Sequence, residues 1–156
     1  MLKIGDKAPA FKLKDQSGTD HTLKEYLNQK KKVLIYFYPK DDTPGCTTEA
    51  CSFRDGMKDL EKLGLVVIGI GKDSVTSHKK FADKYKLNFP ILSDEGLDTI
   101  RVYDAYGPKK FMGREYDGVM RKSVLINGKG IIEKIYERVV PAKHTSEVKV
   151  DVSIKK

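Results

Sequence analysis

Residues 32–71, KVLIYFYPKDDTPGCTTEACSFRDGMKDLEKLGLVVIGIG, decide the fold of this chain. The segment begins with KVLIYFY (32–38) and ends with LVVIGIG (65–71), two continuous apolar runs typical of strands buried on both faces. Between them, residues 47–64 place apolar side chains at helical spacing and end at Gly64, which predicts a helix. A strand, a helix and a second strand at this length predict a right-handed crossover unit with two parallel strands.

The rest of the chain adds further strands and helices to this unit. A Ser74 or Asp73 cap predicts a helix over 74–86, and DEGLDTIRVYDAY predicts another over 94–106. The sequence NGKG and a Ser17-Gly18 turn each indicate a two-stranded hairpin. The segments assigned to these hairpins are 122–126 with 131–138, and 11–23. Together the elements predict an α/β fold with a central mixed β-sheet and helices on both faces.

We expect a single domain over residues 1–156, because no linker, internal repeat or low-complexity segment interrupts the chain. The sequence does not decide the type of the C-terminal element. VKVDVSI (148–154) alternates with a period of two, as a strand does, while Val148 and Val152 have the spacing of a helix face. A strand and a helix are therefore alternatives for residues 144–154.

The composition is that of a charged globular protein, with 39% apolar and 33% charged residues. The net charge is +8, but the basic residues are dispersed, which favours a solvated surface over a nucleic-acid site. No segment has the apolar run of a signal peptide or a membrane span, so we expect a cytoplasmic protein with no membrane partner. In a reducing cytosol, two cysteines indicate a catalytic, redox or metal-binding role.

Motifs for a cofactor or metal do not emerge from the sequence. GIGKDS (69–74) lacks the glycine spacing of a phosphate-binding loop or a dinucleotide fingerprint. His21, His78 and His144 lie far apart, and none has metal-ligand spacing to a cysteine. We therefore expect exposed or capping histidines and no metal site.

Cys46 and Cys51 fall on different faces of the predicted helix. At 100° per residue Cys46 lies within the core-facing stripe, and Cys51 lies about 140° away, near the polar face. A helix N-terminus stabilises a thiolate, so Cys46 is placed to act as a nucleophile, with an inert core cysteine as the alternative. Five residues of intact helix separate the two Cα atoms by roughly 8–9 Å, whereas a disulfide requires about 4.4–6.8 Å. A disulfide between them therefore requires the first helical turns to unwind.

The stretch FYPKDDTPGCTTEAC (37–51) resembles the active-site segment of peroxiredoxins, in particular of their Q-type, bacterioferritin-comigratory branch. Pro39, Thr43 and Cys46 meet the Pro-x-x-x-Thr-x-x-Cys pattern, and a second cysteine five residues on, Cys51, is a feature of that branch. Further segments resemble the family in the same order: GDKAPAFKL (5–13), FPILSD (89–94), FMGREYDGVMRKSVLI (111–126) and PAKHTSEV (141–148).

The resemblance implies a thioredoxin-like fold and the reduction of hydrogen peroxide and organic hydroperoxides without a metal or cofactor. Cys46 would become a sulfenic acid, and Cys51 would convert it to an intramolecular disulfide that thioredoxin or a similar dithiol protein reduces. Arg121 matches the family's active-site arginine and would stabilise the thiolate and the charge on the peroxide. Thr43 would offer its hydroxyl to both, and Pro39 would shield the thiolate from water. We expect a monomer or a weak dimer, with no nucleic-acid partner.

The residues by themselves leave two other function classes open. A general thiol–disulfide oxidoreductase usually carries Cys-x-x-Cys, which this chain lacks. A non-enzymatic basic module with oxidant-sensing cysteines would bind nucleic acid in a salt-dependent way. Without the motif match, Arg121, Thr43 and Pro39 also fit a surface ion pair, a turn and the end of a strand.

Overall fold

The computed structural model describes residues 2–154, in which five helices and nine strands are assigned. The helices are α1 (Leu23–Asn28), α2 (Pro44–Lys62), α3 (Val75–Tyr85), α4 (Asp98–Val102) and α5 (His144–Ile154). The strands are β1 (Lys12–Lys14), β2 (Asp20–Thr22), β3 (Lys32–Phe37), β4 (Leu65–Gly71), β5 (Ile91–Ser93), β6 (Tyr106–Phe111), β7 (Arg114–Val119), β8 (Lys122–Ile126) and β9 (Ile132–Tyr136). None of these helices is long and apolar enough to cross a membrane.

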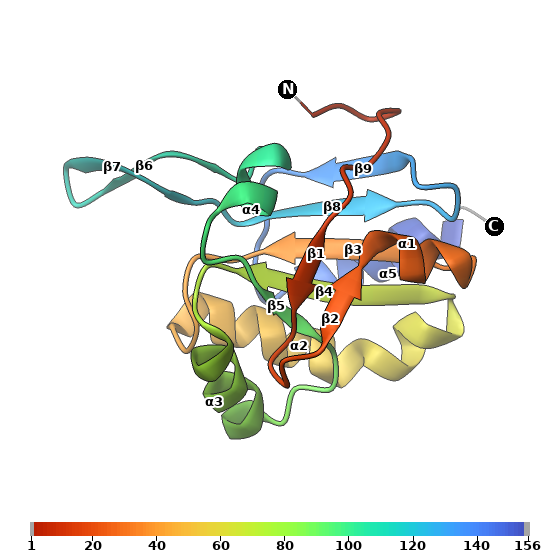
Figure 1. The fold of residues 1–156 in the computed structure, drawn as a ribbon, viewed down its shortest axis with the longest axis horizontal. Helices are drawn as coiled ribbons and strands as arrows, with labels where there is room; N and C mark the ends of the chain where they lie inside the picture. The colour runs from red at the N-terminus through yellow and green to blue at the C-terminus, as the bar shows by residue number, and fades with distance from the viewer. Residues whose placement is uncertain (1, 155–156) are drawn as a thin grey trace.

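Seven of the described strands form one mixed sheet, in the order β2-β1-β5-β4-β3-β8-β9. The central pairs β3–β4 and β4–β5 are parallel, and the outer pairs are antiparallel. The strands β6 and β7 form a separate antiparallel ribbon that projects from the body of the molecule (Figure 1). The predicted crossover unit β3–α2–β4 therefore lies at the centre of the sheet.

Helices cover both faces of the sheet, as the sequence predicts (Figure 1). The side chains of β3 alternate between two apolar layers, because successive residues of a strand point to opposite faces. Leu34 and Tyr36, with Tyr38 just after the strand, pack in the layer that contains the buried side chains of α2, α3 and α5. Val33 and Ile35 pack in the layer that contains those of α1 and α4. Both faces of β3 are buried, which explains its uninterrupted apolar sequence.

The helix predicted over 47–64 is α2, but it begins three residues earlier, at Pro44. Proline suits the first position of a helix, since its fixed φ is helical and the N–H that it lacks would have no partner there. The helix predicted over 74–86 is α3, and the Ser74 side chain accepts a hydrogen bond from the Ser77 N–H, which confirms Ser74 as its cap. Both predicted hairpins are present, as β1–β2 and β8–β9.

The C-terminal element is a helix, so the strand alternative for 144–154 is wrong. Val148 and Val152, four residues apart, are buried in the core, whereas Val150 between them is 56% exposed. The helix predicted over 94–106 is much shorter, since α4 spans five residues. Leu97 before it has a φ of 67°, outside the helical region, and Tyr106 already belongs to β6.

The expectation of exposed or capping histidines is wrong for two of the three. His78 and His144 are 0% and 1% exposed. The two ring nitrogens of His78 face the Asp41 carboxylate and the Leu92 carbonyl. Those of His144 face Glu147 and the Ser123 hydroxyl. Polar partners on both ring nitrogens therefore make both burials possible, and one of them, Glu147, lies in the same helix as His144.

Candidate active site

The cysteine at the start of α2 lies against the sheet. Cys46 is the third residue of the helix and is 2% exposed, in the same apolar layer as Tyr36 and Phe53. The Thr47 N–H makes the first hydrogen bond of the helix, to the Thr43 carbonyl at 2.8 Å. The N–H of Cys46 precedes that bond, so it is one of the helix-terminal groups that can donate to an anion. The position inside the fold is the one that the helical spacing predicts.

Arg121 brings a positive charge to this sulfur from the other side of the site. Its side chain comes from the residue just before β8, and its Nη2 donates to Cys46 Sγ at 3.2 Å. Burial acts to lower the pKa of Arg121, but the charges of Cys46 and Glu49 outweigh it and raise that pKa. The guanidinium therefore stays charged and can hold the sulfur as a thiolate.

Gly45 leaves the space that this contact needs. A Cβ atom at Gly45 would lie 3.1 Å from Nη2 of Arg121, which is tight for a side-chain contact. A larger residue would push the guanidinium away from the sulfur. The close packing of Arg121 therefore explains why a glycine precedes Cys46.

Glu49 completes the ion cluster, although the motif that points to Cys46 and Arg121 does not include it. It lies one turn after Cys46 on the same side of α2, is fully buried, and accepts a 2.8 Å bond from Arg121 Nη1. Burial raises its pKa to about 7, against the opposing attraction of Arg121. Within the described chain, its Oε2 is one of two buried side-chain atoms without a hydrogen-bond partner; the other is the Tyr36 hydroxyl. The sequence does carry a signal for Glu49, because it is a carboxyl residue inside the apolar stripe of the predicted helix.

Glu49→Gln is expected to remove a pH dependence of folding stability. Because the pKa of Glu49 is raised from 4.5 to about 7 in the folded protein, its contribution to stability is present at low pH and is lost as pH rises towards 7. Between pH 5 and pH 8, the free energy of unfolding of the wild type should therefore fall by about 2 to 3 kcal/mol more than that of the variant. Urea unfolding of both proteins at the two pH values measures this double difference, and an equal pH dependence in the two would contradict the assignment.

Two motif residues, Thr43 and Pro39, lie in the loop before α2, and both are half-buried. The Thr43 hydroxyl donates to the Lys40 carbonyl at 3.0 Å, which shapes the loop. Its oxygen remains able to accept a hydrogen bond. The predicted contact of Thr43 with the thiolate and the predicted shielding by Pro39 stay predictions.

Cys51 lies in the same unbroken helix as Cys46, and neither cysteine is in a disulfide. Its side chain is half-buried, whereas Cys46 is buried, so the two differ in exposure as the helical spacing predicts. The intact helix keeps them apart. The structure therefore brings together Cys46 and Arg121 among the predicted site residues, adds Glu49, and leaves Cys51 one turn away.

Comparison with known proteins relates this site to a family. The model of the AhpC/TSA family matches residues 4–135. The chain is 44% identical over 143 residues to "Peroxiredoxin Bcp" of Escherichia coli, covering 92% of this chain and 90% of that protein. It is 43% identical over 147 residues to "Putative peroxiredoxin bcp" of Coxiella burnetii, covering 94% and 96%.

Solved structures agree with the sequence relatives. A cysteine-to-serine mutant of Xylella fastidiosa PrxQ superimposes with a TM-score of 0.92 at 28% identity, over 99% of this chain and 98% of that one. A structure of Xanthomonas campestris Peroxiredoxin Q gives a TM-score of 0.89 at 30% identity, over 99% and 96%. These neighbours have the thioredoxin-like fold of peroxiredoxins, as the sequence resemblance implies. The chain belongs to the AhpC/TSA family, as a peroxiredoxin of its Bcp, or Q-type, branch.

Proposed function

We propose that this thiol-dependent peroxidase reduces hydrogen peroxide and organic hydroperoxides at Cys46, with Cys51 as the resolving cysteine. The observation that carries the proposal is the Arg121 guanidinium, which contacts the Cys46 sulfur at 3.2 Å and Glu49 at 2.8 Å. A buried sulfur at a helix N-terminus beside a fixed cation is suited to react as a thiolate.

In the first step, the Cys46 thiolate attacks the terminal oxygen of the hydroperoxide. A sulfur–oxygen bond forms as the O–O bond breaks, and the sulfur loses two electrons to the peroxide. After protonation the products are Cys46 sulfenic acid and water or an alcohol. Arg121 and the Cys46 N–H stabilise charge that develops on the oxygens, Thr43 orients the peroxide, and Pro39 limits access of water.

In the second step, the Cys51 thiol attacks the sulfenic sulfur, and a disulfide forms with the release of water. Because the helix holds the Cα atoms roughly 8–9 Å apart, the start of α2 unwinds first. A dithiol protein such as thioredoxin then reduces the disulfide by thiol–disulfide exchange and is itself oxidised. Because the cycle needs only one chain, we propose that the protein acts as a monomer or a weak dimer. The chain would act as a single domain over residues 1–156, in a reducing cytoplasm.

A coupled assay tests this function. With thioredoxin, thioredoxin reductase and NADPH, the protein should consume NADPH in proportion to added hydrogen peroxide or an alkyl hydroperoxide. Insulin reduction by dithiothreitol, with this protein but without thioredoxin or peroxide and against a protein-free blank, tests the general thiol–disulfide oxidoreductase. Insulin reduction without peroxide consumption would reject the peroxidase in favour of that alternative.

A further inference from the structure

One residue of the loop that precedes Cys46 has a left-handed backbone conformation. Residues 38–43 connect β3 to α2, and the loop 39–43 within them carries both Pro39 and Thr43. Asp42 within the loop has a φ of 55°, in the left-handed region, which costs energy for a residue with a Cβ. Asp tolerates this region better than most residues with a Cβ, and contacts from elsewhere in the chain hold the loop 39–43 in this shape.

The end of α3 provides one set of these contacts. The Asp42 carboxylate is 2.7 Å from Lys84 Nζ and accepts a 2.6 Å hydrogen bond from the Tyr85 hydroxyl. These hydrogen bonds from Lys84 and Tyr85 lower the pKa of Asp42, so that the carboxylate is ionised at neutral pH. Both donors lie more than 40 positions along the chain from the residue that they hold.

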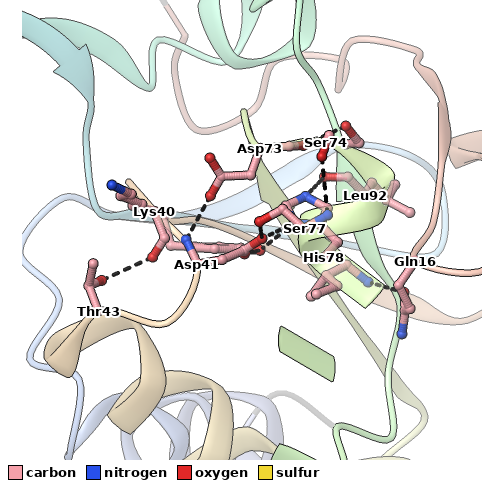
Figure 2. A network of polar contacts seen from close by, with 12 residues as sticks. Gln16, Lys40, Asp41, Thr43, Asp73, Ser74, Ser77, His78 and Leu92 are labelled. Carbon is pink, nitrogen blue, oxygen red and sulfur yellow. Dashed lines mark hydrogen bonds and ion pairs between the residues drawn. The ribbon is translucent and has the colours of Figure 1, made fainter. Parts of the chain in front are cut away.

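The start of α3 provides a second, buried set, which Figure 2 shows. The Asp41 carboxylate is 2.7 Å from the Ser77 hydroxyl and 2.7 Å from Nδ1 of His78, and it also accepts from Tyr38. Nε2 of His78 faces the Leu92 carbonyl of β5 at 3.1 Å, so the ring lies between the loop and the sheet. The Asp41 N–H donates to the Asp73 carboxylate, so the backbone of the loop is held as well.

Another contact fixes α2 beyond the second cysteine. The Ser52 hydroxyl donates to Thr145 Oγ1 of α5 at 2.8 Å. One turn later, a Cβ at Gly56 would lie 2.7 Å from the Thr145 methyl, so the two helices pack closely there. The segment 44–51, which contains both cysteines, therefore lies between an end held by α3 and an end held by α5.

We propose that α3 is a clamp whose contacts with Asp41 and Asp42 set the balance between the helical and unwound forms of residues 44–51. The inference rests on the proposed function. The helical form places Cys46 against Arg121 for reaction with peroxide, whereas the unwound form lets Cys46 reach Cys51. A weaker clamp shifts the population towards the unwound form, so the two chemical steps respond differently. The α3 side chains Lys84, Tyr85, Ser77 and His78 are then positioning residues that act through the loop.

The Lys84→Met/Tyr85→Phe double variant tests the clamp without substituting any residue of the loop or either cysteine. Quenched-flow mixing with hydrogen peroxide, followed by alkylation and mass spectrometry, gives separate rates for sulfenic acid and disulfide formation. We expect disulfide formation to accelerate about fivefold, and oxidation by peroxide to slow by no more than that factor. Amide hydrogen exchange over 44–51 should rise by about the same factor.

Asp83→Asn is the matched control, because it removes an exposed ion pair with Lys79 on the same helix. It should leave both rates and the exchange at wild-type values. Ser77→Ala, which removes one bond to Asp41, should accelerate disulfide formation in the same direction. Disulfide formation at the wild-type rate or slower in both Lys84→Met/Tyr85→Phe and Ser77→Ala overturns the clamp. A wild type that forms no sulfenic acid at Cys46 would instead overturn the proposed function and the clamp with it.

Discussion

Cys46→Ser is expected to abolish peroxide consumption, lowering the rate by on the order of 10³ or more. The reacting species in the proposed cycle is the thiolate, and a serine hydroxyl does not ionise near neutral pH. Arg121 and the helix N-terminus would then have no anionic nucleophile to stabilise. The NADPH-coupled assay measures the loss.

The fold of the Cys46→Ser protein must be checked, because the sulfur is 2% exposed. Serine is close to cysteine in size and can accept from Arg121 in place of the sulfur, so far-UV circular dichroism and thermal unfolding should stay near wild type. A folded variant that keeps its peroxidase rate would contradict Cys46 as the nucleophile. A variant that loses both fold and activity is replaced by Cys46→Ala for the same measurement.

Cys51→Ser is expected to keep the first turnover and lose the cycle. Cys46 would still react with one equivalent of peroxide at close to the wild-type rate, because Cys51 lies one turn away from the ion cluster of Cys46, Arg121 and Glu49. The sulfenic acid would then persist, since the chain has no third cysteine to resolve it. Thioredoxin-dependent turnover should fall by on the order of 100-fold or more.

The measurement for Cys51→Ser is a single-turnover experiment beside a steady-state one. A sulfenic-acid probe should label Cys46 in the variant and give much less signal in the wild type at the same time point. Steady-state turnover with thioredoxin at the wild-type rate would contradict Cys51 as the resolving residue. Recovery of turnover on addition of a small external thiol would support it.

The parts of the fold that the sequence predicts are those whose pattern is local. β3 and β4 are buried on both faces, so their apolar runs are unbroken, and α2 between them has a regular apolar stripe. The ribbon β6–β7 was not predicted, because the first four residues of β7 are all exposed and show no alternation. The period-two valines of α5 fitted a strand equally well, and contacts with the core decide for the helix.

In the site too, the sequence predicts what depends on local pattern and misses what depends on tertiary contacts. The helical spacing of α2 predicts the placement of Cys46 and Cys51, and the family resemblance points to Arg121. Which groups surround the sulfur depends on tertiary contacts: Arg121 is 75 positions from Cys46, and His78 is 37 from Asp41. Neither separation leaves a periodic signal in the sequence, and so the buried histidines and the α3 contacts came from the structure.

The proposed cycle requires one chain to complete both oxidation steps through Cys46 and Cys51. Mass spectrometry after one equivalent of hydrogen peroxide, with the remaining thiols alkylated, reads out both steps at once. We expect the loss of two hydrogen masses, no alkylated cysteine, and a linked peptide that joins Cys46 to Cys51. A lasting oxygen on Cys46 with Cys51 still alkylated would contradict the intramolecular cycle, and an unchanged protein would contradict the peroxidase itself.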